Sequence, residues 1–265
     1  MLQKDDMKGV LRSFFLIINY KTLIITCLSV VSSVLCFHWG LIARFPDMLV
    51  GVAIVFPVVF SIGSAYNRRE TALQRFSDFK GHSITLYYAS RDWIPVGQDN
   101  HLSVTVRKMI AEMVTLIRVM FTSRHKHEWE QNEKKIYEYF SALSHLTIEM
   151  RRMGVQSTEI SRINQYISKM IIAFDNLKII HTYRTPVTLR AYSKVFIYLF
   201  PVLYGPYFAS TFRDYSGHLE YVMPVLYSFI LVSLDNIQDH LEHPFDEVGE
   251  DDIRIDENEI TSHMN

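Results

Sequence analysis

The side chains best suited to chemistry in this sequence are its eleven histidines and two cysteines. His125 and His127 lie two residues apart, so they point to different faces of a helix and lack the HExxH spacing of a zinc site. Cys27 and Cys36 both fall in one apolar run, where small packing side chains are expected rather than a disulfide or a metal pair. The sequence therefore predicts no metal site and no cofactor.

The motifs of common enzymes are also missing from the sequence. It contains neither a GxSxG nucleophile elbow nor a glycine-rich phosphate loop. Its basic residues are interspersed with acidic ones, which is not the pattern of a nucleic-acid-binding surface. We therefore expect a protein that is not an enzyme and has no nucleic-acid partner.

Charged residues make up 21% of the chain, yet they are absent from three long runs. These runs cover residues 22–43, 48–67 and 195–212, and a shorter run covers 221–234. A helix of about 20 residues spans a hydrocarbon core of about 30 Å, so each long run predicts a membrane helix. Residues 221–234 could form a buried helix of a soluble protein, but beside three longer runs we interpret them as a fourth membrane helix. The first run is too long for the core of a signal peptide.

The basic residues indicate how these helices cross the membrane. Four precede the first run, and most of the others lie between Ala65 and Lys194. The loop after the first run and the loop after the third carry one each, Arg44 and Arg213. The positive-inside rule then predicts a multi-pass integral membrane protein whose N-terminus, middle segment and C-terminus are cytoplasmic.

The expected fold class is an all-α membrane protein, with four transmembrane helices per subunit and a large helical cytoplasmic domain. Apolar residues at helical spacing around Ile110, Ile136 and Ile163 predict amphipathic helices in the middle segment. The predicted divisions are an N-terminal segment with the first transmembrane hairpin (1–67), a cytoplasmic helical domain (68–194), a second transmembrane hairpin (195–240) and an acidic cytoplasmic tail (241–265).

Acidic residues dominate the end of the chain, where Arg254 is the one basic residue after Asp235. Such a run is usually a solvated tail. The alternative is docking on a basic cytoplasmic surface, such as that of a neighbouring subunit, and cation binding by the carboxylates is a third reading.

The second apolar run places three bulky side chains, Val52, Phe56 and Phe60, on one helical stripe. Any apolar helix offers such triplets, so packing against lipid or other helices explains the stripe by itself. Pro57 adds information because a proline inside a helix frees the carbonyl four residues earlier, that of Ala53. In hydrocarbon this carbonyl needs a protein partner or a water-filled cavity. The helix is therefore predicted to lie inside an assembly.

Two short motifs resemble those of the bestrophin family of ion channels. In "SAYNRRE", Ala65, Tyr66 and Arg68 match the Ala-Tyr-x-Arg that follows the family's second membrane helix. In "EHPFDEVGEDD", Pro244 and Phe245 match the Pro-Phe before its acidic stretch. The helical layout also fits, so the resemblance covers nearly the whole chain.

The resemblance implies a homopentamer with one central pore, lipid around it and small inorganic ions as the conducted species, which in many members are anions such as chloride. The family's neck residues lie at i, i+4 and i+8, the last of them eight positions before the arginine, which here gives Val52, Phe56 and Phe60. Rings of such residues can gate a pore by dewetting. The alternatives are a non-conducting membrane scaffold or regulatory protein of the same fold, a cation-selective channel, and a membrane enzyme or transporter.

The sequence departs from the family after Pro-Phe. Four residues separate this motif from the acidic triplet that begins at Glu250, whereas the calcium clasp of animal members needs a compact acidic run directly after it. We therefore carry over no calcium ligands.

Overall fold

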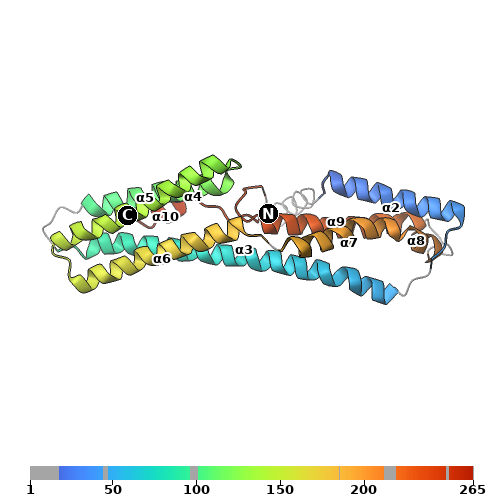
Figure 1. Ribbon diagram of the computed structural model, residues 1–265, viewed down its shortest axis with the longest axis horizontal. Coiled ribbons are helices and arrows are strands. Elements are labelled where there is room, and N and C mark those ends of the chain that lie inside the picture. Colours follow the sequence, from blue (N-terminus) through green and yellow to red (C-terminus); the bar gives the residue numbers. More distant parts are fainter. Residues whose placement is uncertain are drawn as a thin grey trace, which may run out of the picture. The chain divides into compact units, whose positions relative to one another are not determined.

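The computed structural model of this chain describes residues 18–43, 47–95, 101–184, 186–211, 219–248 and 251–264, without the side chains of 47–50, 53, 54 and 220. These residues form helices joined by turns and loops, and no strand occurs among them (Figure 1). The helices are α2 (Tyr20–Trp39), α3 (Asp47–Asp92), α4 (His101–Thr122), α5 (Lys126–Arg152), α6 (Ser157–Thr182), α7 (Val187–Leu203), α8 (Gly205–Thr211), α9 (Leu219–Glu242) and α10 (Glu257–Thr261). The prediction of an all-α fold is confirmed for this part of the chain.

The chain folds into two compact units. The first unit consists of Met1–Arg68 and Arg184–Glu242, and the second unit of Arg69–Tyr183 and His243–Asn265. The helix α3 is continuous over 46 residues and contributes to both. The charged residues that follow the second apolar run therefore do not end the helix, because they belong to a stretch rich in good helix formers such as Glu70, Ala72 and Leu73.

In the first unit, α2 begins and ends at well-defined caps. The Asn19 side chain accepts hydrogen bonds from the backbone N–H groups of Lys21 and Thr22, while the Thr22 hydroxyl accepts one from the Asn19 backbone. Such a capping box satisfies donors that the first helical turn leaves unpaired. At the other end Gly40 adopts a left-handed conformation, with φ of 67°, which a glycine accepts at little cost.

The polarity of α2 is the reverse of that of a helix in a soluble protein. Its buried side chains are Thr22, Ser29, Ser33 and Cys36, whereas its large apolar side chains are mostly exposed. Small and hydroxylated residues between helices, with apolar residues outside, are typical of membrane helices. By length and composition, α2 is the one helix of the described residues that qualifies as a membrane span.

The third apolar run, predicted as one membrane helix, is broken between α7 and α8. The carbonyl of Val202 cannot receive the usual helical bond from residue 206, because Pro206 has no N–H. The hydroxyl of Ser32 donates to this carbonyl at 2.7 Å, and that of Ser29 donates to the carbonyl of Pro201 at 2.8 Å. The hydroxyl groups of Ser29 and Ser32 on α2 thus stabilise the break.

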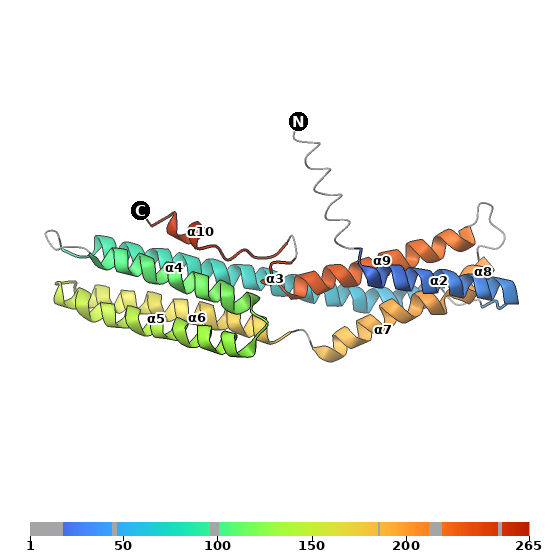
Figure 2. The same ribbon diagram turned by 90° about the horizontal axis from the view of Figure 1, so that it is seen from above.

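The second unit is a helical bundle with an ordinary apolar core. Ile110 of α4, Ile136 of α5 and Ile163 of α6 are fully buried, as their spacing predicts. The helix α5 packs against both α4 and α6 (Figure 2). Phe76 and Phe79 of α3 belong to the same core.

The acidic tail is docked on the second unit. Ile253, Ile255, Ile260 and Met264 are buried in its core, and the short helix α10 contacts α4. The prediction of a solvated tail is therefore wrong for residues 251–264. The apolar residues between the acidic ones explain the difference, because they favour burial on the bundle.

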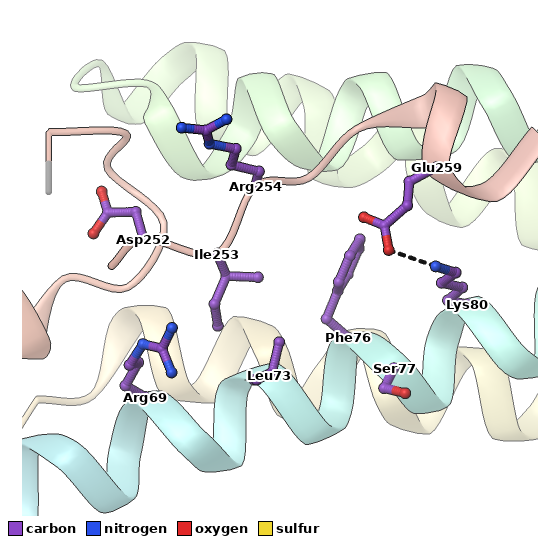
Figure 3. A pocket seen from close by; sticks show the side chains of 9 residues that line it. All are labelled: Arg69, Leu73, Phe76, Ser77, Lys80, Asp252, Ile253, Arg254 and Glu259. Carbon is purple, nitrogen blue, oxygen red and sulfur yellow. Dashed lines mark hydrogen bonds and ion pairs between the residues drawn. The ribbon is translucent and has the colours of Figure 1, made fainter. Parts of the chain in front are cut away.

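The tail also borders a hollow of about 390 Å³ on α3. In Figure 3, Ile253 points towards Leu73, and Phe76 reaches up from α3 towards the tail. The ammonium group of Lys80 pairs with the Glu259 carboxylate. Docking on basic residues, the alternative considered for this tail, thus occurs within the same chain.

Candidate functional site: the apolar stripe of α3 and its supporting motifs

The predicted neck residues lie on an exposed face of α3. In the single chain the exposed fractions of Val52, Phe56 and Phe60 are 51%, 59% and 61%. The rings of Phe56 and Phe60 are in contact, with their centroids 5.1 Å apart. The three residues therefore form one continuous apolar stripe that none of the described helices of the first unit covers.

The opposite face of α3 is buried in the first unit. Val58, Ser61 and Ala65 are almost inaccessible, and Val58 belongs to a small core with Ile197 of α7 and Val232 of α9. At about 100° per residue, Val58 lies about 200° around the helix from Phe56. The packing of α3 on α7 and α9 thus turns the stripe outwards.

Pro57 lies within α3 and does not end it. The side chain of Ala53, whose carbonyl Pro57 leaves without its usual donor, lies outside the described residues. That this carbonyl meets protein or water in an assembly stays a prediction.

The Ala-Tyr-x-Arg motif joins α3 to the end of α9. Ala65 is buried and Tyr66 is exposed. The Nε atom of Arg68 donates to the carbonyl of Glu242, the last residue of α9, at 3.3 Å. A guanidinium group at this position both satisfies a terminal carbonyl and opposes the negative end of the helix dipole.

The Pro-Phe motif anchors the start of the tail in the second unit. Phe245 is buried and stacks on Phe121 of α4, with centroids 4.9 Å apart, and Phe121 stacks on His181 of α6. The carbonyl of Pro244 accepts a hydrogen bond from the backbone N–H of Ile253 at 2.8 Å. The motif therefore determines where the docked tail begins.

The acidic residues after Pro-Phe make local contacts. Glu247 accepts two hydrogen bonds from the Arg118 guanidinium, at 2.6 and 3.1 Å, and these hold the pKa of its carboxyl below the usual value. Asp246 accepts a bond from the backbone N–H of Val248. Within the described ranges, which omit Glu250, no three His, Cys, Asp or Glu side chains gather as a metal site would require.

Among the described residues, the histidines and cysteines first considered for chemistry form no metal-binding group. Cys27 is exposed and Cys36 is buried, and both thiols are free. His125 and His127 are exposed near the start of α5, and the His127 ring lies 3.4 Å from the Gln131 amide.

A row of polar contacts between α7 and α9 did not emerge from the sequence. Its pairs are Tyr198 with Asp235, Lys194 with Asp239, and Arg190 with Glu242. The members lie about one turn apart on each helix, with basic or phenolic groups on α7 and carboxylates on α9. This complementary spacing could have predicted the row, although the residues around Tyr198 and before Asp235 are apolar and indicate membrane helices instead. We call this row the α7–α9 seam.

Comparisons with known proteins identify the fold. No known family model matches the sequence, and no curated protein does. Among solved structures, a variant of a bacterial bestrophin homologue from Klebsiella pneumoniae aligns with a TM-score of 0.75 at 16% identity, covering 92% of this chain and 97% of that one. A second variant gives a TM-score of 0.75 at 17% identity, with 92% and 95% coverage. A third structure of this homologue, solved by Zn-SAD phasing, gives a TM-score of 0.71 at 16% identity, with 92% and 97% coverage. The resemblance seen in the two motifs is thus confirmed in three dimensions, and this chain has the bestrophin fold.

Proposed function

We propose that this chain is one subunit of a homopentameric ion channel, in which Val52, Phe56 and Phe60 form a hydrophobic neck. The observation that carries the proposal is the orientation of α3. Its small, buried face packs on α7 and α9, and its bulky apolar stripe is left uncovered on the opposite side. Five such stripes around one axis would give three apolar rings, and narrow apolar rings gate by dewetting.

The membrane placement is supported by the first unit. Its helix α2 buries hydroxyl groups and exposes aliphatic side chains, which is favourable in hydrocarbon and unfavourable in water. Membrane helices in the segments 1–67 and 195–240, with the remaining residues in the cytoplasm, also agree with the distribution of basic residues. The four crossings and the cytoplasmic termini are part of the proposal.

The conducted ion is proposed to be a small anion such as chloride. This choice rests on the resemblance to the bestrophin family, because the neck side chains are uncharged and do not set the sign of the ion. The reversal potential of purified protein in a planar bilayer under a salt gradient tests it. A shift towards the equilibrium potential of the cation would show a cation-selective channel instead.

The neck is tested by truncating its side chains. We expect Phe56→Ala and Phe60→Ala to raise the current of reconstituted protein by about an order of magnitude, which corresponds to about 1.4 kcal/mol of barrier. The reason is that a wider, less apolar ring stays wet. The matched control is Phe37→Ala on α2, which removes an equally large exposed ring away from the stripe.

Two other results would count against the neck or against ion conduction. Unchanged current in the two stripe variants, or an equal rise in the control, would show that the stripe is not the neck. Silence of the wild type and of all variants would favour the scaffold or regulatory alternative.

A further inference from the structure

The α7–α9 seam contains one carboxyl group that forms no ion pair with a described residue. Asp235 is fully buried, and its Oδ2 accepts a hydrogen bond from the Tyr198 hydroxyl. Its Oδ1 is buried without a hydrogen-bond partner among the described residues. By contrast, Asp239 contacts the ammonium groups of Lys194 and Lys21, at 3.1 and 3.7 Å.

A second unpaired acceptor lies one helical turn further along α9. Gln238 is also fully buried, and its Nε2 donates to Oε1 of Glu242 at 3.1 Å. This bond directs Oε1 of Gln238 away from Glu242, and Oε1 has no partner among the described residues. Residues at i and i+3 share a helix face, so Asp235 and Gln238 are neighbours on α9.

The groups around Asp235 do not supply the missing donor. The helix α7 contributes Tyr198 and Lys194, α2 contributes Lys21, and α9 contributes Asp239, while Tyr20 of α2 interacts with Tyr198. Both lysines make their ion pairs with Asp239 rather than with Asp235. From α3, the run 48–67 carries no charge, and its Ser61 is buried without a hydrogen-bond partner.

Oδ1 of Asp235 and Oε1 of Gln238 are both acceptors without a donor, and they belong to neighbouring residues on one face of α9. A single hydrogen atom shared between them would satisfy both. A buried carboxylate without a cation is strongly disfavoured, and such a group usually takes up a proton instead. A neutral acid has one hydroxyl to donate and one carbonyl oxygen to accept. The Tyr198 hydroxyl already donates to Oδ2, so the proton belongs on Oδ1.

We propose that Asp235 keeps a proton on Oδ1 at neutral pH and donates it to Oε1 of Gln238, which makes this end of the seam a buried proton-binding site. One proton then satisfies both orphaned acceptors. The inference rests on the geometry of the first unit alone and does not depend on ion conduction.

Infrared spectroscopy of the purified full-length protein tests the protonation directly. The carbonyl band of a protonated carboxyl group should be present in the wild type at neutral pH and lost in Asp235→Asn. The matched control is Asp239→Asn, one turn away, whose replacement should leave the band intact because Asp239 forms ion pairs with Lys194 and Lys21. The proposal is wrong if the wild-type spectrum lacks this band, or if the band persists in Asp235→Asn.

The pH dependence of thermal unfolding provides a second test of the bound proton. The folded state holds one proton that the unfolded state releases, so the free energy of unfolding should fall as the pH rises from neutral. Asp235→Asn supplies its own N–H donor to Gln238, and its melting temperature should depend less on pH. Equal pH dependence in both proteins, or a wild-type melting temperature that rises when sodium replaces choline, would contradict a proton at this site.

Discussion

One hydroxyl group of α2 replaces a backbone donor that a proline removes. Ser32 donates to the carbonyl of Val202, whose helical partner would have been Pro206, and Ser29 donates to the carbonyl of the residue before it, Pro201. In an apolar surrounding, an unpaired carbonyl is costly, so these contacts hold α2 close to the α7–α8 break. The closeness requires a glycine at position 205, where a Cβ atom would clash with the side chain and backbone of Ser32.

We therefore expect Gly205→Ala to destabilise the protein by about 1–3 kcal/mol, the usual range for overpacking. The melting temperature of the purified protein in detergent measures this effect. Gly81→Ala is the matched control, because a Cβ atom at that position of α3 meets nothing within 4 Å. A helical alanine there should be neutral or slightly stabilising. Equal melting temperatures for Gly205→Ala and the wild type would mean that α2 and α8 do not approach this closely.

Among the structural elements, the C-terminal tail is docked on the helical bundle by two kinds of contact. Its apolar residues enter the core of the second unit, and its acidic residues meet Arg118 and Lys80. The ion pairs are largely exposed, and exposed pairs contribute little to stability. Burial of the apolar residues is therefore the main reason that the tail stays bound.

We therefore expect Ile255→Ala to weaken the docking of the tail by about 2–5 kcal/mol, the usual cost of such a truncation in a core. Hydrogen exchange of residues 251–264 should then be faster, while that of α5 should change little. Val248→Ala, at an exposed position, serves as the control. If high salt alone speeds exchange in the wild type as much as Ile255→Ala does, the ion pairs would be the main anchor.

At the scale of the whole molecule, the two units differ in where they place apolar side chains. The second unit has a large apolar core of the kind that folds in water. The first unit has a small core, and its exposed side chains include many aliphatic ones from α2, α3, α7 and α9. A chain that buries apolar side chains in one unit and exposes them in the other suits an environment that is part hydrocarbon and part water.

The proposed pentamer has a definite mass. The protein in lipid nanodiscs or mild detergent should have a protein mass five times the 31.1 kDa of one chain. Native mass spectrometry measures this mass directly. A dimer or a monomer under conditions where the protein remains folded would contradict the pentamer, and the neck of five stripes with it.

Much of the fold could be predicted because its signals are local. The spacing around Ile110, Ile136 and Ile163 predicts the buried faces of α4, α5 and α6, and the two short motifs led to the bestrophin fold. The continuous α3 was less evident, because a change from apolar to charged residues resembles a helix end. The neck assignment and the domain boundaries stay predictions.

The sequence by itself determined that the described chain is helical and where its long uncharged runs lie, since periodicity and the absence of charge act over a few turns of one chain segment. Only the tertiary structure decided which face of α3 is left uncovered, that the acidic tail docks on its own bundle, and that Lys194 and Lys21 pair with Asp239 rather than with Asp235. These outcomes depend on contacts between segments up to about two hundred positions apart, such as Asn19 with Asn236. A local sequence pattern cannot predict such contacts, because each contact depends on how the other segments pack.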